Sequence, residues 1–163
     1  MQLDSRSRLP EVLVSADTPP SESVTSGTAE AQWLLPRTAR SAHRARGLLR
    51  TQLTEWKVDD DTACTAELLL SELVSNSVRH ARTPPGRDIG VRVAWYGGRL
   101  RVEVADADDT RPNVRKADGE DEQGRGLAII EALAARWGCC PRRYGIGKAT
   151  WAEVALPDGA QPR

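Results

Sequence analysis

The clearest pattern along the chain is an apolar arc with helical spacing over residues 63–81. The positions on this arc are Ala66, Leu69, Leu70, Leu73 and Val74. The aspartates and the threonine at 59–62 are typical of a helix start, because their side chains accept hydrogen bonds from the free backbone amides of the first turn. The pattern therefore predicts a core helix, which the Thr-Pro-Pro-Gly sequence at 83–86 ends.

Alternation of apolar and polar residues, which is typical of strands, follows this helix. It occurs at 89–95 and again at 100–104, with a Gly-Gly turn between the two runs, and predicts a β-hairpin. A shorter apolar run at 31–35 predicts an earlier strand. A glycine-rich turn at 145–147 and an apolar segment at 149–156 predict a last hairpin.

Two more helices are predicted, one before the core helix and one after the hairpin. The first begins with Thr38 as its cap and runs to about Trp56. The second opens with the Gly-Arg-Gly sequence at 124–126 and ends with Gly138 as a C-terminal cap. Its inner face is assigned to Leu127, Ile130, Leu133 and Trp137.

The order of elements is strand, helix, helix, two strands, loop, helix and two strands. It predicts an α+β protein, a two-layer α/β sandwich with its helices packed on one face of a mixed, mainly antiparallel sheet. Residues 107–123 hold nine charged side chains in seventeen and are expected to form a long mobile loop. We expect residues 1–28 to be a disordered tail, residues 29–157 to be the single domain, and residues 158–163 to be a short C-terminal tail.

Composition changes the expectations about location and partners. The 23 basic and 23 acidic residues cancel, so the net charge favours neither nucleic acid nor an anionic membrane as a partner. No segment approaches the roughly 20 apolar residues of a membrane span, and the N-terminus lacks the apolar core of a signal peptide. The three cysteines have neither zinc-site spacing nor a disulfide pattern. We therefore expect a soluble cytoplasmic protein without nucleic acid or membrane partners.

Glu72 and Asn76 are the first candidate site residues. They lie one helical turn apart on the predicted core helix, at the border of its apolar arc. An amide oxygen is a neutral hard ligand suited to Mg²⁺, and a carboxylate beside it can polarise a water or hydroxyl group. The alternative to a functional role is a structural one, in which the two side chains lie at the edge of the core and form hydrogen bonds only to backbone or water.

Asp106 ends the second strand of the predicted hairpin. It has the same parity as the apolar positions Val102 and Val104, so its side chain is predicted to point to the buried face. An unpaired carboxylate there is costly, and a donor is expected to bond it. An exocyclic amine such as N6 of adenine and the backbone amides of a strand-end turn are both candidates.

A short glycine-containing segment at a helix start is a candidate for phosphate binding. Its residues are Gly124, Arg125, Gly126 and Leu127. Glycines permit close backbone approach, and free amides and the helix dipole favour anions. The segment is too short for a Walker A loop and does not follow a strand directly. Lys148 and Thr150 add a cation and a hydroxyl group after the last glycine turn, although on an edge strand either side chain can face solvent.

Together these segments resemble the GHKL (Bergerat-fold) ATPases, and within them the anti-sigma-factor serine/threonine kinases that are abundant in actinobacteria. The resemblance covers about residues 31–156. Residues 72–81 look like the N box, 102–106 like the strand that enters the G1 box, 124–127 like the G2 box, and 147–151 like the final strand. Their order and separations make the match specific.

The resemblance implies ATP and Mg²⁺ as cofactors and a role for each candidate. Glu72 is the catalytic residue that activates the attacking group, and Asn76 binds Mg²⁺. Asp106 binds the adenine amine, and the amides near Gly124 and Gly126 hold phosphate. The other residues expected to bind the nucleotide are Arg125, Leu127, Lys148 and Thr150. The implied partner is an STAS-type anti-sigma antagonist, with a sigma factor as the alternative target, and such proteins often form homodimers.

Two other functions stay open on the sequence. The family's G1 pattern is Asp-x-Gly, whereas this chain has Asp108 in place of the glycine, which is expected either to weaken ATP binding or to require a local shift of the loop. This departure favours a module that sequesters a partner, with or without a nucleotide and without kinase activity. The catalytic half of a sensor histidine kinase shares the same boxes, but it needs a phospho-acceptor histidine, and neither His43 nor His80 fits that role.

Overall fold

The computed structural model describes residues 27–80, 86–108, 122–142 and 146–162. The elements in chain order are β1 (Ala29–Pro36), α1 (Arg40–Glu55), α2 (Asp60–His80), β2 (Asp88–Tyr96), β3 (Arg99–Asp106), α3 (Glu122–Leu133), β4 (Arg136–Pro141) and β5 (Lys148–Ala155). The strands form one sheet in the order β1-β2-β3-β5-β4, and each neighbouring pair is antiparallel.

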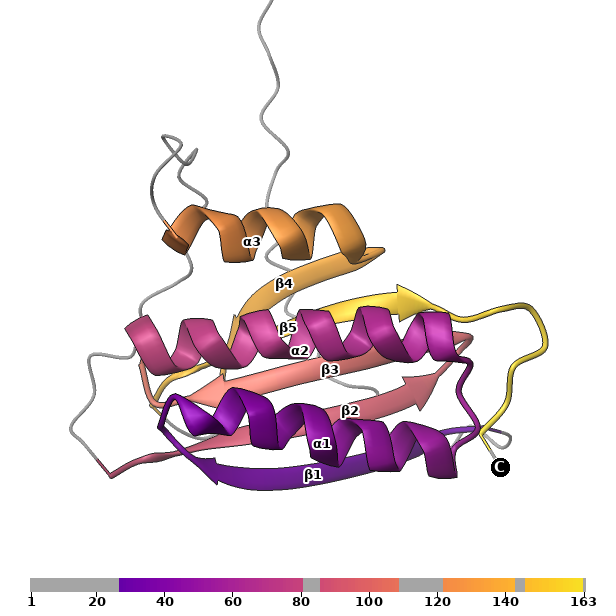
Figure 1. Ribbon diagram of the computed structural model, residues 1–163, viewed down its shortest axis with the longest axis horizontal. Helices are drawn as coiled ribbons and strands as arrows, with labels where there is room; N and C mark the ends of the chain where they lie inside the picture. The colour runs from indigo at the N-terminus through magenta and orange to yellow at the C-terminus, as the bar shows by residue number, and fades with distance from the viewer. Residues whose placement is uncertain (1–26, 81–85, 109–121, 143–145, 163) are drawn as a thin grey trace, which may run out of the picture.

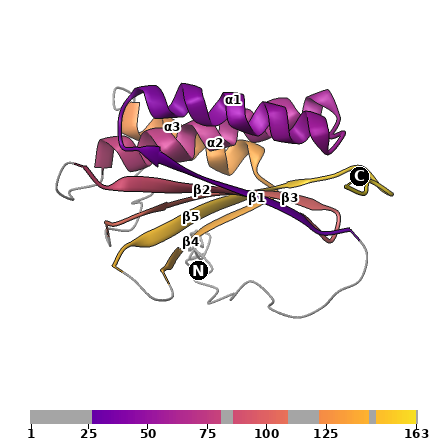
Figure 2. The same ribbon diagram turned by 90° about the horizontal axis from the view of Figure 1, so that it is seen from below.

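The helices lie together on one face of this sheet (Figures 1 and 2). α2 occupies the middle of the helix layer, where it packs on β3 and β5 and has α1 and α3 as neighbours. The predicted two-layer α+β architecture is therefore confirmed. Within the described residues the sheet is antiparallel throughout.

The core lies between the helix layer and the sheet. All five positions of the predicted apolar arc on α2 are buried: Ala66, Leu69, Leu70, Leu73 and Val74. Opposite them, the sheet contributes alternate residues of β2 and β3, among them Val91, Val93, Val102 and Val104. Burying one such side chain stabilises the fold by about 1.5–3 kcal/mol. This packing fixes the rotation of α2 and leaves Glu72 and Asn76 half-buried on its flank.

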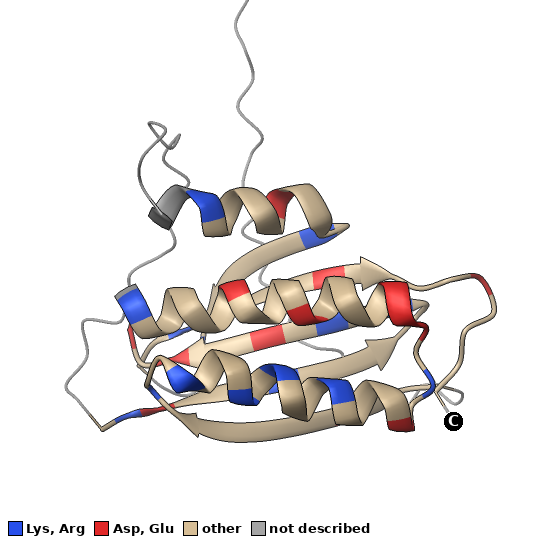
Figure 3. Ribbon diagram, viewed as in Figure 1, with Lys and Arg blue, Asp and Glu red and all other residues tan. Residues whose placement is uncertain are grey.

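The start of α2 is capped as the sequence predicts. The Asp59 carboxylate accepts a hydrogen bond from the backbone amide of Thr62 at 2.9 Å. α1 carries several basic residues (Figure 3), and two of its arginines form hydrogen bonds to α2. Arg50 donates to Glu67 at 2.8 Å, and Arg46 donates to the Ser71 hydroxyl at 3.1 Å.

The predicted cap of α1 at Thr38 is wrong. α1 begins at Arg40, its N-cap position is Ala39, and no side chain caps it. The Thr38 hydroxyl lies 3.3 Å from that of Ser41, which in turn donates to the carbonyl of Pro36. The threonine is therefore part of the turn between β1 and α1, one residue before the cap position.

The predicted extent of the last helix is also wrong at both ends. α3 begins at Glu122, so the Gly-Arg-Gly sequence lies inside its first turns, and it ends at Leu133, whose side chain is 41% exposed. The chain joins the sheet at Ala135, whose amide donates to the Glu153 carbonyl at 2.8 Å. Trp137 belongs to β4 and not to the helix.

Gly138 is a strand residue and not a helix cap. It lies in β4 directly opposite Trp151 of β5. A Cβ atom at Gly138 would lie 2.8 Å from Cζ2 of that indole ring, so the glycine gives the ring its space. The Trp151 ring also stacks against the guanidinium of Arg101, which lies 4.0 Å from its centroid.

β5 is an inner strand, between β3 and β4. Lys148 and Thr150 are both buried, so the alternative in which they face solvent from an edge strand is wrong. Both residues are on the helix-covered face of the sheet, because they pair with Asp106 and Val104 of β3.

Several predictions concern residues outside the described ranges. They are the disordered tail up to residue 26, most of the charged loop at 107–123, and Gly145 in the last turn. Within the described part of the chain, no helix is long and apolar enough to cross a bilayer.

Candidate functional site

One flank of α2 meets α3 at the candidate site. A Cβ atom at Gly126 would lie 2.8 Å from Oε2 of Glu72 and 3.2 Å from Oδ1 of Asn76. The two α2 side chains therefore point at the backbone of α3, and only a residue without a side chain fits there unchanged. The structure brings the segment at 124–127 next to Glu72 and Asn76 of α2.

At Gly126 the missing side chain matters for the site, and the backbone amide does not. α3 begins at Glu122, so the amides without an intrahelical partner belong to the first four helical positions, which include Gly124 but not Gly126. Leu127 is buried in the core next to this point, and Arg125 is exposed. Among the predicted phosphate-site residues, Gly126 lies directly against the side chains of Glu72 and Asn76.

Asp106 is buried, with 2% of its side chain exposed, and both of its oxygens are hydrogen-bonded. Oδ2 accepts from the hydroxyl of Ser77 at 2.7 Å. Oδ1 accepts from the backbone amide of Asp108 and from Nζ of Lys148, both at 3.0 Å. The expected strand-end bond to a backbone amide is present, together with two side-chain donors that the sequence pattern does not indicate.

Lys148 reaches Asp106 because the two residues are direct cross-strand partners on β5 and β3. Its ammonium also donates to the carbonyl of Asp108 at 3.0 Å. The chain just before Lys148 lies against the end of β3: a Cβ atom at Gly147, whose φ is +110°, would come within 1.9 Å of the Asp106 carbonyl oxygen. Lys148, which the sequence predicts as a cation of the nucleotide site, thus forms a buried ion pair with Asp106.

Thr150 lies two residues further along β5, on the same face as Lys148 and directly opposite Val104. It is buried, and its hydroxyl contacts the sulfur of Cys139 on β4 at 3.7 Å.

A short stretch of α2 joins the two halves of the candidate site. Glu72 and Asn76 face Gly126 of α3, and Ser77, the next residue, bonds to Asp106 of β3. Together with the bond from Lys148 to Asp106, these contacts place the end of β3, the start of β5 and the first turns of α3 around one segment of α2.

Ser77 is a site residue that the sequence reasoning missed. It lies inside the N-box segment, but a serine on a helix has no pattern of its own that indicates a partner 29 positions away. The one signal available was the buried carboxylate at Asp106, which required a donor from somewhere in the fold.

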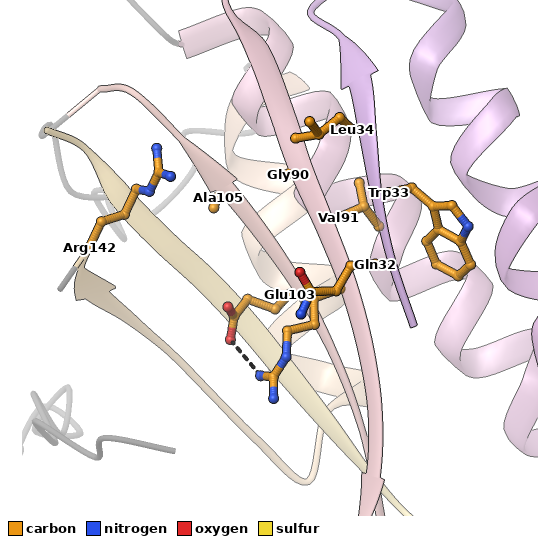
Figure 4. Close-up of a pocket in the computed structure, with 9 residues that line it drawn as sticks. Gln32, Trp33, Leu34, Gly90, Val91, Glu103, Ala105 and Arg142 are labelled. Carbon is orange, nitrogen blue, oxygen red and sulfur yellow. Dashed lines mark ion pairs between the residues drawn. The ribbon is translucent and has the colours of Figure 1, made fainter. Parts of the chain in front are cut away.

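A separate hollow of about 280 Å³ lies on the helix-free face of the sheet (Figure 4). The small residues Gly90 and Ala105 form its floor, and Arg92 and Glu103 form an ion pair at 3.8 Å beside it. Its other lining residues are Gln32, Trp33, Leu34, Val91 and Arg142. None of the predicted site residues lines this hollow, because they project from the opposite face or from the helices.

The chain belongs to the histidine kinase-like ATPase domain family, whose model matches residues 35–156. This membership confirms the resemblance to the GHKL ATPases. No curated protein matches the chain.

The solved structures that are similar to this chain include the following two. The RsbU and RsbW domains of Rv1364c from Mycobacterium tuberculosis align with a TM-score of 0.62 and 24% identity over 82% of this chain and 33% of that one. This likeness supports the assignment of the fold, and the chain spans about one third of that protein's length. The blue-light-activated histidine kinase of Erythrobacter litoralis EL346 aligns through its histidine kinase domain with a TM-score of 0.43 and 21% identity, over 75% of this chain and 62% of that one.

Proposed function

We propose that this protein is an anti-sigma-type regulator that binds Mg-ATP at the α2–α3 junction and transfers the γ-phosphoryl group to a serine or threonine of a partner protein. The observation that carries the proposal is the junction itself, where Glu72 and Asn76 point at the bare backbone of Gly126. Because Gly126 has no side chain, nothing pushes the carboxylate and the amide oxygen aside, and both groups stay beside the start of α3, where the phosphates and their metal ion would bind.

The residues at the junction fit a magnesium ion bound together with phosphate. Mg²⁺ in such sites takes one or two protein oxygens and completes its shell with phosphate and water. Asn76 would supply the protein oxygen, and the ion would neutralise charge on the phosphates during transfer. The amides in the first turn of α3, at Gly124 among others, add donors and the positive end of the helix dipole.

Glu72 is proposed to hold the partner's hydroxyl group and accept its proton. The new bond forms between that hydroxyl oxygen and the γ-phosphorus, and the bond from this phosphorus to the β–γ bridging oxygen breaks, so that ADP leaves with the electron pair. Positioning and charge neutralisation supply most of the rate acceleration in such reactions. The half-buried flank position of Glu72 suits this task, because the carboxylate is held by a packed helix and still reaches the site.

The base end of the nucleotide is assigned to Asp106, beside Thr150 and Lys148. Its buried carboxylate, at the end of β3, is the expected acceptor for the amine of adenine. Arg125 is exposed at the first turns of α3 and is proposed to contact phosphate, while Leu127 anchors α3 in the core.

The proposed partner is an STAS-type anti-sigma antagonist, with a sigma factor as the alternative target and the cytoplasm as the location. The protein is also proposed to act as a homodimer. The support is the family match together with the fold shared with a structure that contains an RsbW domain.

The test is transfer of labelled phosphate from ATP to a candidate STAS-domain protein from the same organism. We expect a phosphorylated serine or threonine on the partner. The Glu72→Ala variant should lower turnover by roughly 10²- to 10⁴-fold, as loss of a general base does, with nearly unchanged ATP affinity. Glu131→Ala, which removes an exposed carboxylate from α3, is the matched control and should retain the wild-type rate. Equal phosphorylation by wild type and Glu72→Ala would remove Glu72 from its proposed role.

The second candidate function is partner sequestration without phosphoryl transfer. It is favoured by the bonding of Asp106, whose oxygens accept from Ser77, Lys148 and the Asp108 amide. Calorimetry and thermal melting in millimolar ATP with Mg²⁺ distinguish the two functions. Absence of both heat and thermal stabilisation, together with partner binding, would favour sequestration.

A further inference from the structure

We propose that Lys148 is a specificity-determining residue of the nucleotide site, because its ammonium group occupies the oxygen of Asp106 that a 6-aminopurine needs. This inference rests on the proposed function, since it concerns the base that the same site accepts. It predicts that Lys148 weakens the binding of adenine nucleotides and reduces the preference for a 6-amino group.

The contacts of Asp106 leave no oxygen without a donor. Ser77 bonds one oxygen at 2.7 Å, and the Asp108 amide and Lys148 bond the other at 3.0 Å each. A carboxylate offers about four acceptor positions, so the position that these donors leave is on the oxygen that Ser77 of α2 holds, and an amine that approaches Oδ1 has to compete with a donor already there. The serine and the backbone amide are fixed by α2 and by the end of β3, so the flexible lysine side chain is the donor that can leave.

The register of the sheet keeps Lys148 in place. Lys148 and Asp106 face each other across β5 and β3, and the approach of Gly147 to the Asp106 carbonyl holds the two strand ends together. The ammonium has a second acceptor in the Asp108 carbonyl, and its side chain is 11% exposed. Moving a charged group away from such partners costs free energy that the incoming base has to supply.

The chemistry of the base edge makes the effect specific. The 6-amino group of adenine is a donor, as the lysine ammonium is, so the two compete for the same oxygen. The 6-oxo group of hypoxanthine is an acceptor and can receive a hydrogen bond from the ammonium while the ion pair stays intact. With lysine at this position, the usual advantage of ATP over inosine triphosphate should be small.

The experiment measures, by calorimetry with Mg²⁺, the affinities of the full chain for ATP and inosine triphosphate. We expect wild type to differ less than about threefold between the two nucleotides, and Lys148→Met to bind ATP about tenfold more tightly than wild type and to prefer ATP over inosine triphosphate. Lys57→Met, which removes an exposed ammonium group from the turn after α1, is the matched control and should leave both affinities at their wild-type values.

A wild-type preference for ATP of more than about tenfold would overturn the inference even if Lys148→Met does not fold, because it would mean that Asp106 already accepts the amine freely. Equal ATP affinities of wild type and a folded Lys148→Met would overturn it as well, and would leave the proposed function standing. Failure of both proteins to bind any nucleotide would overturn the proposed function itself and this inference with it.

Discussion

At the scale of single residues, the candidate site depends on Gly126, which lies against Glu72 and Asn76, and on the buried Asp106–Lys148 pair. The glycine is predictable, because a Gly-x-Gly sequence at a helix start indicates close approach by something. What approaches it in the fold is the carboxylate of Glu72 and the amide of Asn76. The ion pair is not predictable from local pattern, since Asp106 and Lys148 are 42 positions apart and meet only through the strand register.

Replacing Gly126 with alanine tests the junction directly. The new Cβ would lie 2.8 Å from Oε2 of Glu72, the far end of a flexible side chain, so we expect Glu72 to move and the fold to persist. A displacement of about 1 Å at a reacting group can cost roughly 10²-fold in rate, and we expect a loss of this size in phosphoryl transfer.

Gly47→Ala is the matched control for this substitution. Gly47 lies in α1, has nothing within 4 Å of its added Cβ, and should gain about 0.5–1 kcal/mol of stability with no change in transfer rate. Thermal melts of both variants and single-turnover rates give the comparison. A Gly126→Ala variant with the wild-type rate would mean that the Glu72 position does not matter for transfer.

At the scale of elements, α2 determines the site because it carries Glu72, Asn76 and Ser77 on a packed scaffold. Its apolar arc and its aspartate start are strong local signals, and both predictions are confirmed. The last helix was harder to predict, because Trp137 continues the helical spacing of Leu127 and Ile130 although the chain has already entered β4. The pairing of β4 with β5 outweighs the helical spacing of these apolar residues.

The cap of α2 supplies a pH-dependent prediction. The hydrogen bond from the Thr62 amide lowers the pKa of Asp59 below its ordinary value of 3.8. Its contribution to stability is therefore complete above that value and is lost as the pH falls through the lower pKa of the folded state. Asp59→Ala should reduce the free energy of unfolding by about 1 kcal/mol at pH 7, and the difference from wild type should shrink toward pH 3.

Urea denaturation of wild type and Asp59→Ala at several pH values between 7 and 3 measures this difference. Asp61→Ala is the control, since it removes a first-turn carboxylate that interacts with the helix dipole and should cost less. A constant difference between wild type and Asp59→Ala across the pH range would show that the ionised carboxylate does not cap α2.

At the scale of the whole molecule, the fold class and the family are predictable, whereas the position of β5 is not. Alternation along a strand indicates which face is buried but not which neighbours the strand has. β5 lies between β3 and β4, and this placement buries Lys148 and Thr150 and puts the lysine on Asp106. The central claim, that α2, α3 and the ends of β3 and β5 form one nucleotide site, depends on this topology.

The most direct measurement of that claim is a crystal structure of the full chain with Mg²⁺ and a non-hydrolysable ATP analogue. We predict that the phosphates lie beside Gly126, with Asn76 on the metal ion and Glu72 near the γ-phosphate, and that the purine lies at Asp106 with the Lys148 ammonium displaced. An analogue bound elsewhere, such as in the hollow on the helix-free face of the sheet, or none bound at saturating concentration, would contradict the account.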